Sequence, residues 1–380
     1  MARSGLRPGR SDTERSRGAQ TGGSGHDSPA VVDTASALAG LVARIGAATR
    51  VGVDTEADSL HCYREKVCLV QIGLAEADEL VDPLADLDLT PFLGALSGVE
   101  VVMHGADFDL RMLYRLGFGA PSAIFDTMIA ARLTGAPRYG YAALVAEHFG
   151  VALTKGPQTA NWALRPLPPR LAQYARNDTH FLLPLAERLG RRLDELGRRG
   201  WLEQSCGRVV DAARVVRERD PETEWRVRGS HVLRPRAAAV LRELWRWRER
   251  EAEAADRPPF HVLSNADLVD AAGRFDRGER VAPRGLRSGR LARFGLAAEE
   301  ALRLEEAEWP VRPPGRARPQ FTRAQDRRLA ALRGRRDRKA KELAIDADLI
   351  APRAALERVA VEGDDALAGL LPWQWSLLRG

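Results

Sequence analysis

The stretch Val51-Gly-Val-Asp-Thr-Glu56 joins the apolar residues of a buried strand to two carboxylates. Side chains of a strand alternate between its two faces, so Asp54 and Glu56 point the same way. Neighbouring carboxylates resist joint ionisation, and a divalent cation removes this penalty because it prefers oxygen ligands. A solvated edge strand can also carry Asp-x-Glu, so the prediction of a metal site depends on the rest of the chain.

The size and charge of the chain set its general class. Its 380 residues suffice for two or three domains, and 44% hydrophobic with 29% charged residues is typical of a soluble globular protein. The net charge of +6 divides into +2 for residues 1–30, −3 for 31–200 and +7 for 201–380. An acidic segment beside a basic one fits a metal site joined to a polyanion-binding surface, although basic residues also serve solubility.

Cysteine usage and hydropathy indicate the compartment. Cys62, Cys68 and Cys206 form no C-x-x-C pair and leave one cysteine over, which indicates reduced thiols in a cytoplasmic protein. The N-terminus has no apolar signal segment, and no run of about 18 apolar residues occurs. We therefore expect neither secretion nor a membrane span.

Strand and helix patterns alternate through the first 200 residues. Strands are predicted at 51–56, 67–72, 79–82 and 99–103, and helices at 34–48, 90–97, 107–116, 127–133 and 170–196. Hairpin-like strands followed by strands that alternate with helices predict an α/β domain with a mixed sheet. Thr90 is the predicted N-cap of its helix, with Pro91 as the first helical residue.

The chain after Gly229 is predicted to be all helical, with an internal repeat. Seven positions match at an offset of 88 residues: Leu241/Leu329, Leu244/Leu332, Arg248/Arg336, Ala252/Ala340, Val262/Ile350, Leu268/Leu356 and Ala272/Ala360. This repeat predicts two copies of one small helical domain. Residues 309–320, with four prolines, are the predicted linker, and the polar residues 1–30 a disordered tail.

Two further segments carry acidic residues that belong with the first pair. His104-Gly-Ala-Asp-Phe-Asp-Leu110 lies where a strand ends and a helix begins, the usual position of sites in α/β sheets. Asp107 fits the N-cap, whereas Asp109 fits a site-facing position in the first turn, and the pattern alone does not decide between them. Tyr174-x-x-x-Asp178 places a phenol and a carboxylate on one helical face, although this spacing is also common on solvated surfaces.

In order and spacing, Asp54-x-Glu56, Asp109 and Tyr174-x-x-x-Asp178 resemble the motifs of the DEDD family of 3′→5′ exonucleases. The resemblance is to the tyrosine subtype, because Gln173 stands where the histidine subtype has its histidine. It also selects Asp109 over Asp107.

The flanking segments Val67-Cys-Leu-Val-Gln-Ile72 and Lys155-x-x-Gln158-x-x-x-Trp162-x-x-Arg165-Pro-Leu167 resemble ribonuclease D and its relatives. The repeated helical units resemble HRDC (helicase and ribonuclease D C-terminal) domains. The second unit departs from the first, since Arg335 stands where the first has Trp247.

This resemblance implies a ribonuclease H-like α/β exonuclease domain, a mixed sheet with flanking helices, at residues 31–215. An HRDC domain at 229–308 and a second HRDC-like domain at 321–380 would follow. The implied activity is a 3′→5′ exoribonuclease that releases nucleoside 5′-monophosphates in tRNA 3′ maturation or structured-RNA trimming, acting as a monomer. The alternatives are a non-catalytic RNA-binding adaptor and a DNA-directed 3′→5′ exonuclease.

The resemblance also implies roles for the site residues. Asp54 would contact both of two Mg²⁺ or Mn²⁺ ions, Glu56 and Asp178 would complete the ion that holds the attacking water, and Asp109 would serve the other ion through waters. Tyr174 would orient the attacking water, because a phenol with a pKa of about 10 is a poor base.

Other residues are candidates for RNA contacts, with packing as the competing interpretation. They are His104, Lys155, Gln158, Arg165 and Arg248. Trp162 and Phe108 are expected to pack rather than to stack on bases. Residues 31–228 are expected to form a core of their own, and the basic helices beyond them to bind RNA phosphates.

Overall fold

The structure, a computed structural model, describes residues 31–154, 156, 159–215, 220–311, 321–363, 366 and 369–379. The predicted tail at 1–30, most of the predicted linker, Lys155 and Gln158 lie outside these residues. Within the described ranges, no helix is long and apolar enough to cross a bilayer.

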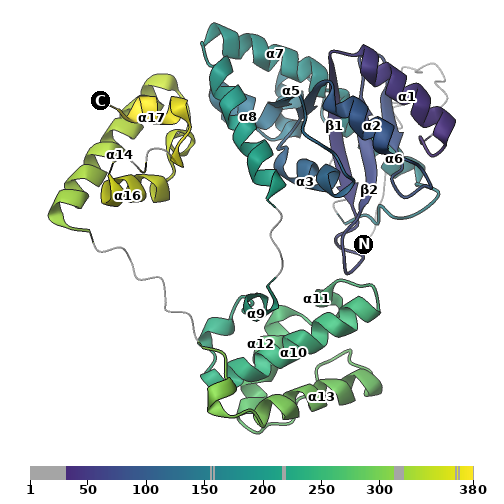
Figure 1. Ribbon diagram of the computed structural model, residues 1–380, viewed down its shortest axis with the longest axis vertical. Helices are drawn as coiled ribbons and strands as arrows, with labels where there is room; N and C mark the ends of the chain where they lie inside the picture. Colours follow the sequence, from purple (N-terminus) through teal and green to yellow (C-terminus); the bar gives the residue numbers. More distant parts are fainter. Residues whose placement is uncertain are drawn as a thin grey trace, which may run out of the picture. The chain divides into compact units, whose positions relative to one another are not determined.

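The described strands form one five-stranded sheet in the order β3-β2-β1-β4-β5. Figure 1 labels two of them, β1 and β2. The strands are β1 (Arg50–Ala57), β2 (Val67–Gly73), β3 (Asp78–Val81), β4 (Glu100–Met103) and β5 (Ala123–Asp126). β1, β2 and β3 pair antiparallel, whereas β4 and β5 run parallel to β1, which confirms the predicted mixed sheet. The strand β5 was missed because only its last two residues are buried, too few to show a pattern.

Helices cover both faces of the sheet. They are α1 (Ala35–Ala47), α2 (Thr90–Ser97), α3 (Asp107–Arg115), α4 (Thr127–Thr134), α5 (Tyr141–Phe149), α6 (Pro169–His180), α7 (Leu182–Glu195) and α8 (Arg199–Arg214). Val51 and Val53 pack with α1, α2 and α3 in one hydrophobic cluster. The opposite face, which carries Asp54 and Glu56, meets α6 and α7.

Two glycines let the α6–α7 segment lie directly on this face. A Cβ atom at Gly73 would stand 3.0 Å from the Thr179 carbonyl oxygen, and one at Gly52 would stand 3.3 Å from Leu182. Larger residues at these positions would push the segment away from β1 and β2. The close approach therefore brings the end of α6 next to the carboxylates of β1.

The single helix predicted at 170–196 is wrong, because the chain breaks at Phe181 between α6 and α7. The backbone N–H of Phe181 donates to the Tyr141 hydroxyl at 3.1 Å instead of continuing the α-helical ladder. This contact joins residues 40 positions apart, so the local pattern does not contain it.

The predicted helix starts at Thr90 and Asp107 also need correction. Thr90 and Asp107 are already the first helical residues, and the N-caps are Leu89 and Ala106, neither with a side-chain cap bond. Asp107 instead forms an ion pair with Arg111 one turn later, at 2.9 Å.

Two helical units follow the sheet domain. The first contains α9 (Pro221–Glu224), η1 (Ser230–Val232), α10 (Pro235–Ala254), α11 (Pro259–Val262), α12 (Asn265–Asp276), α13 (Ser288–Leu302) and η2 (Glu306–Glu308). The second contains α14 (Arg323–Leu343), α15 (Ala347–Ile350), α16 (Arg353–Glu362) and α17 (Pro372–Leu378). Trp225 lies in the core of the first unit, so this core begins before the predicted start at Gly229.

One hydrogen bond supports the repeat at the level of structure. Arg248 donates to the Leu263 carbonyl at 3.2 Å, and Arg336 donates to the Ala351 carbonyl at 3.0 Å. Both the donors and the acceptors are 88 residues apart. The units differ where expected: Trp247 is buried in the first core against Phe294, whereas Arg335 donates to the Leu378 carbonyl of α17.

The expectation that residues 31–228 form a core of their own holds only in part, because two hydrophobic clusters lie wholly within these residues but a third does not. Side chains of the second unit share one hydrophobic cluster with those of α4, α7 and α8. Trp201 of α8 stacks on Trp373 of α17, with ring centroids 4.7 Å apart. The buried Arg198 donates to the carbonyl oxygens of Leu133 and Leu343, at 2.7 and 2.8 Å. Truncation after Arg228 would therefore expose apolar surface that the full chain buries.

Candidate active site

The first two acidic residues lie side by side on β1, facing α6. Asp54 and Glu56 are partly buried and separated by Thr55, as the alternation of a strand requires. Gln71 lies opposite Asp54 on β2, and its Nε2 donates to Asp54 Oδ2 at 3.3 Å. The sequence pattern marks Gln71 only as part of a strand, yet this fully buried amide orients the first carboxylate.

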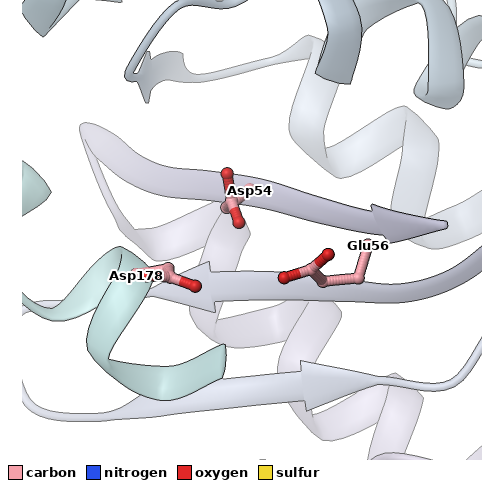
Figure 2. Close-up of side chains that lie close together, drawn as sticks. All are labelled: Asp54, Glu56 and Asp178. Carbon is pink, nitrogen blue, oxygen red and sulfur yellow. The ribbon is translucent and has the colours of Figure 1, made fainter. Parts of the chain in front are cut away.

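Asp178 of α6 completes a group of three carboxylates. One oxygen each from Asp54, Glu56 and Asp178 lies within 4.8 Å of the others. Figure 2 shows the three side chains converging, two from β1 and one from the helix. An all-oxygen donor set of this kind suits a hard divalent cation, so these residues fit the predicted metal site.

The fourth carboxylate, Asp109, reaches the same region from α3. The pairing of β1 with β4 ends at Gly52, so β1 continues beyond that neighbour. Asp109 Oδ1 accepts from the backbone N–H of Thr55 at 3.0 Å and from its hydroxyl at 2.6 Å. Asp109 is 6% exposed, whereas the Asp107 side chain is 57% exposed, so the structure orients Asp109 toward the site.

Asp126 holds the starts of two helices, α3 and α4. Its carboxylate accepts from the N–H groups of Met128 and Ile129 in α4, and also from those of Gly105 and Ala106 just before α3. These four bonds satisfy donors that a helix N-terminus leaves without partners. Because Asp109 lies in the first turn of α3, Asp126 is a positioning residue for it.

The assembled carboxylates are costly to ionise. Burial, with repulsion from Asp109, Asp178 and Glu56, raises the pKa of Asp54 well above its usual range. Burial, with repulsion from Asp178 and Asp109, raises the pKa of Glu56 to about 8. Burial raises the pKa of Asp178 to about 7, against a hydrogen bond from Tyr174. It raises the pKa of Asp109 to about 6, against the two bonds from Thr55.

These pKa shifts predict how the stability of the folded protein depends on pH when no metal is bound. Folded Glu56 and Asp178 keep protons up to about pH 8 and 7, whereas unfolded carboxyls lose them near pH 4. The free energy of unfolding should therefore fall as pH rises from about 5 to 8. In a chelator we expect the melting temperature to drop by at least about 3 °C over this range, since 1 kcal/mol corresponds to about 2–4 °C.

The measurement is thermal unfolding at several pH values with chelator or Mg²⁺. Glu56→Gln should flatten the decline, and Mg²⁺ should raise the melting temperature most at pH 8, where the carboxylates are ionised. A melting temperature that rises or stays level from pH 5 to 8 in chelator would contradict the repulsion among these groups.

Tyr174 lies one turn before Asp178 and shares its side of α6. Its ring packs near the buried Trp162, with centroids 6.2 Å apart. Burial, followed by the charges of Asp178 and Glu56, raises the pKa of the phenol. The hydroxyl therefore keeps its proton at neutral pH and serves as a hydrogen-bond donor, not as a base.

The backbone at Gly156 makes room for the Tyr174 ring. A Cβ atom there would stand 2.0 Å from two ring carbons and 2.5 Å from the hydroxyl oxygen, distances that no packing tolerates. We predict that Gly156→Ala displaces the phenol and lowers catalytic activity about tenfold to a hundredfold, as misplacement by 1 Å commonly does.

The matched control is Gly94→Ala, because a Cβ at Gly94 of α2 meets no atom within 4 Å. Mononucleotide release should be compared for the two variants at equal fold content, checked by circular dichroism. Full activity of Gly156→Ala would show that the ring position is not needed.

Three of the RNA-contact candidates that the structure describes are engaged within the protein. Arg165 donates to the Asp82 carboxylate at 2.5 and 2.6 Å and to the Cys68 carbonyl, which ties the segment before α6 to β2 and β3. His104 Nδ1 lies 2.9 Å from the Thr127 hydroxyl. Arg248 is 5% exposed inside the first helical unit. These placements favour the packing interpretation and oppose an RNA contact by Arg248.

The two aromatic residues near the site, Trp162 and Phe108, differ in their exposure to solvent. Trp162 is 4% exposed and packs as expected. Phe108, which precedes Asp109, is 46% exposed, so the expectation that it packs is wrong. Asp109 and Leu110, the next two residues of α3, point into the protein, whereas Phe108 lies on the side of the helix that faces solvent.

A mixed sheet that presents four carboxylates and a tyrosine beside them fits a 3′→5′ exonuclease. A family model described as 3′-5′ exonuclease matches residues 29–194, and the HRDC domain model matches residues 237–277 in the first helical unit.

The chain is 33% identical to ribonuclease D of Pseudomonas paraeruginosa over 82% of this chain and 84% of that one. It is 32% identical to ribonuclease D of Xanthomonas oryzae pv. oryzae over 87% of this chain and 91% of that one. The chain therefore belongs to the ribonuclease D family and is a 3′→5′ exoribonuclease.

Solved structures show the same fold. A protein from Bifidobacterium adolescentis superposes with a TM-score of 0.78 over 92% of this chain and 95% of that one, at 24% identity. Escherichia coli RNase D, an exoribonuclease involved in structured RNA processing, superposes with a TM-score of 0.66 over 92% of this chain and 98% of that one, also at 24% identity.

Proposed function

We propose that this protein trims the 3′ ends of structured RNA, tRNA precursors among them, by metal-dependent hydrolysis. The observation that carries this proposal is the convergence of Asp54, Glu56 and Asp178 within 4.8 Å, with Tyr174 on the same helix face. The products would be nucleoside 5′-monophosphates. The three cysteines, all buried and free, agree with a reducing, cytoplasmic setting. The protein would act as a monomer.

The carboxylates would hold two divalent cations, Mg²⁺ or Mn²⁺. Asp54, at the centre of the cluster, would be shared between them, with Glu56 and Asp178 on one ion. Asp109, already bonded to Thr55, would serve the other through waters. Such ions activate the attacking water and stabilise the charge that develops on the phosphodiester.

The side chains of this protein would position the attacking water and the metal ligands. Tyr174 would donate a hydrogen bond that orients the attacking water, since its raised pKa keeps it protonated. Gln71 holds Asp54, and Asp126 holds the start of α3, so both ligand-bearing segments are fixed before substrate arrives. Positioning of this kind reduces the entropic part of the barrier.

The test uses the full-length protein and an RNA hairpin with a single-stranded 3′ tail, labelled at its 5′ end. With Mg²⁺ we expect stepwise shortening from the 3′ end and release of 5′-monophosphates, abolished by chelator and restored by Mn²⁺. Binding without shortening would mean an RNA-binding adaptor. Faster shortening of a matched DNA tail would mean a DNA-directed exonuclease.

A further inference from the structure

We propose that one face of α14 in the second helical unit binds the phosphate backbone of the double-helical part of an RNA whose 3′ tail enters the active site. This inference rests on the proposed function and names the surface that would hold the structured portion of the substrate.

The helix α14 concentrates the positive charge of the chain. It contains nine arginines and lysines and three acidic residues, a net charge equal to the +6 of the whole protein. The corresponding helix of the first unit, α10, contains five basic and four acidic residues. The two repeats therefore present different electrostatic surfaces.

Four of these cations form a stripe along one side of α14. Arg323, Arg327, Arg338 and Lys341 fall within about 60° of arc at 100° per residue, and they span about 27 Å of helix. All four are exposed. The buried residues Leu329, Leu332 and Ala340 occupy the opposite side.

The stripe is not neutralised by neighbouring residues. Other basic residues of α14 pair with acids: Arg333 with Glu357, Arg336 with Asp337 and Asp348, and Lys339 with Glu342. Within the part of the chain that the structure describes, no ion pair or hydrogen bond engages the side chains of the four stripe residues. Like charges at i and i+4, as at Arg323 and Arg327, destabilise a helix, so the stripe costs stability that an anionic partner would offset.

Two of the four stripe positions are used differently in the first unit. At the offset of 88 residues, Arg327 corresponds to Ala239, which is fully buried, and Lys341 corresponds to Glu253, which pairs with Arg64 of the β1–β2 loop at 2.8 Å. These two positions of α10 are thus buried or paired within the protein, whereas their counterparts on α14 are exposed; Arg338 matches Arg250, which is exposed as well.

The composition of the stripe favours backbone contacts of duplex RNA. The helix α14 contains no aromatic residue, and Ala330, Ala331 and Gly334 lie between the two pairs of cations. Single-stranded nucleic acid is held mainly by bases stacked on aromatic rings, whereas duplex RNA is recognised by shape and by phosphate and 2′-OH contacts. Small residues between the cations let the helix surface approach the backbone closely.

The test compares two full-length double variants with equal loss of charge. Arg327→Gln/Arg338→Gln removes half of the stripe. The control, Lys339→Gln/Arg353→Gln, removes two cations of the same unit that are paired with Glu342 and Glu357. Affinity is measured by fluorescence anisotropy against salt, with Ca²⁺ in place of Mg²⁺, for an RNA hairpin with a 3′ tail and for the tail alone.

For Arg327→Gln/Arg338→Gln we expect hairpin affinity to fall about tenfold or more at 0.15 M salt, with a salt slope less steep by about 1.5–2. Tail affinity, the control variant and Mg²⁺-dependent release of mononucleotides from the tail should stay at parental values. Equal melting temperatures of the two variants show that folding is not the cause.

Three results would overturn the inference: unchanged hairpin affinity, the same loss in the control variant, or an equal loss of tail affinity. Vesicles of phosphatidylcholine and phosphatidylserine form a further arm, and loss of vesicle binding with intact RNA binding would assign the stripe to a membrane surface. Failure of the parent to release mononucleotides would instead refute the proposed function, because the binding assays do not depend on turnover.

Discussion

Asp54→Asn is expected to reduce mononucleotide release at least about 10²-fold, equal to about 2.7 kcal/mol of activation free energy, while RNA binding and the fold persist. Asp54 is repelled by each of the other three carboxylates, and its charge would be shared by both cations. An amide keeps the shape and the hydrogen bond from Gln71 but removes this charge. Release is measured under single-turnover conditions in Mg²⁺.

The same substitution should stabilise the protein without metal. Repulsion from Asp109, Asp178 and Glu56 contributes to the raised pKa of Asp54, and asparagine removes this repulsion. In chelator at pH 8 we expect the melting temperature of Asp54→Asn to exceed that of the parent by about 2–4 °C for each kcal/mol regained. A variant that is inactive because it is misfolded would melt lower instead.

Asp107→Asn is the matched control, because Asp107 lies on the same helix turn as Asp109 but forms only a surface ion pair with Arg111. It should keep nearly full activity, since exposed pairs of this kind contribute about 0–1 kcal/mol to stability. Retention of more than a few per cent activity by Asp54→Asn, or dependence on Asp107 in place of Asp109, would show that the metal ligands are assigned wrongly.

Tyr174→Phe is expected to lower the rate of the chemical step about 10²-fold with little change in RNA affinity. The phenol can donate one hydrogen bond. Its ring packs near Trp162 and fills the space that Gly156, which has no side chain, leaves free. Phenylalanine keeps the ring and removes only the donor. The measurement is the single-turnover rate from pH 6 to 9, where the protonated phenol predicts a similar loss at each pH. An unchanged rate would make Tyr174 a packing residue.

A double variant connects this result with the backbone at Gly156. If Gly156→Ala acts by displacing the Tyr174 hydroxyl, then Gly156→Ala/Tyr174→Phe should lose about as much as the more severe single variant. Additive losses would mean that Gly156 acts on another part of the site, because independent positions combine their free energies.

The local patterns of the chain predicted most of the candidate catalytic residues. The alternation of β1 places Asp54 and Glu56 on one face, and the i, i+4 spacing of α6 places Tyr174 beside Asp178. Both rules relate residues a few positions apart, so they hold before any tertiary contact forms. The choice of Asp109 needed the family resemblance, since either aspartate of that segment fits a helix start.

The sequence by itself thus determined the mixed sheet, the acidic motifs and the helical repeat. Tertiary structure decided which neighbouring residues support the site. Thr55 donates hydrogen bonds to Asp109, Gln71 donates one to Asp54, and Asp126 accepts from the starts of two helices. The backbone of Gly156 lies against the Tyr174 ring. It also buried Arg248, exposed Phe108, and broke the helix at Phe181. Most of these features depend on residues far apart along the chain, and their distances are set by packing, which no local periodicity encodes.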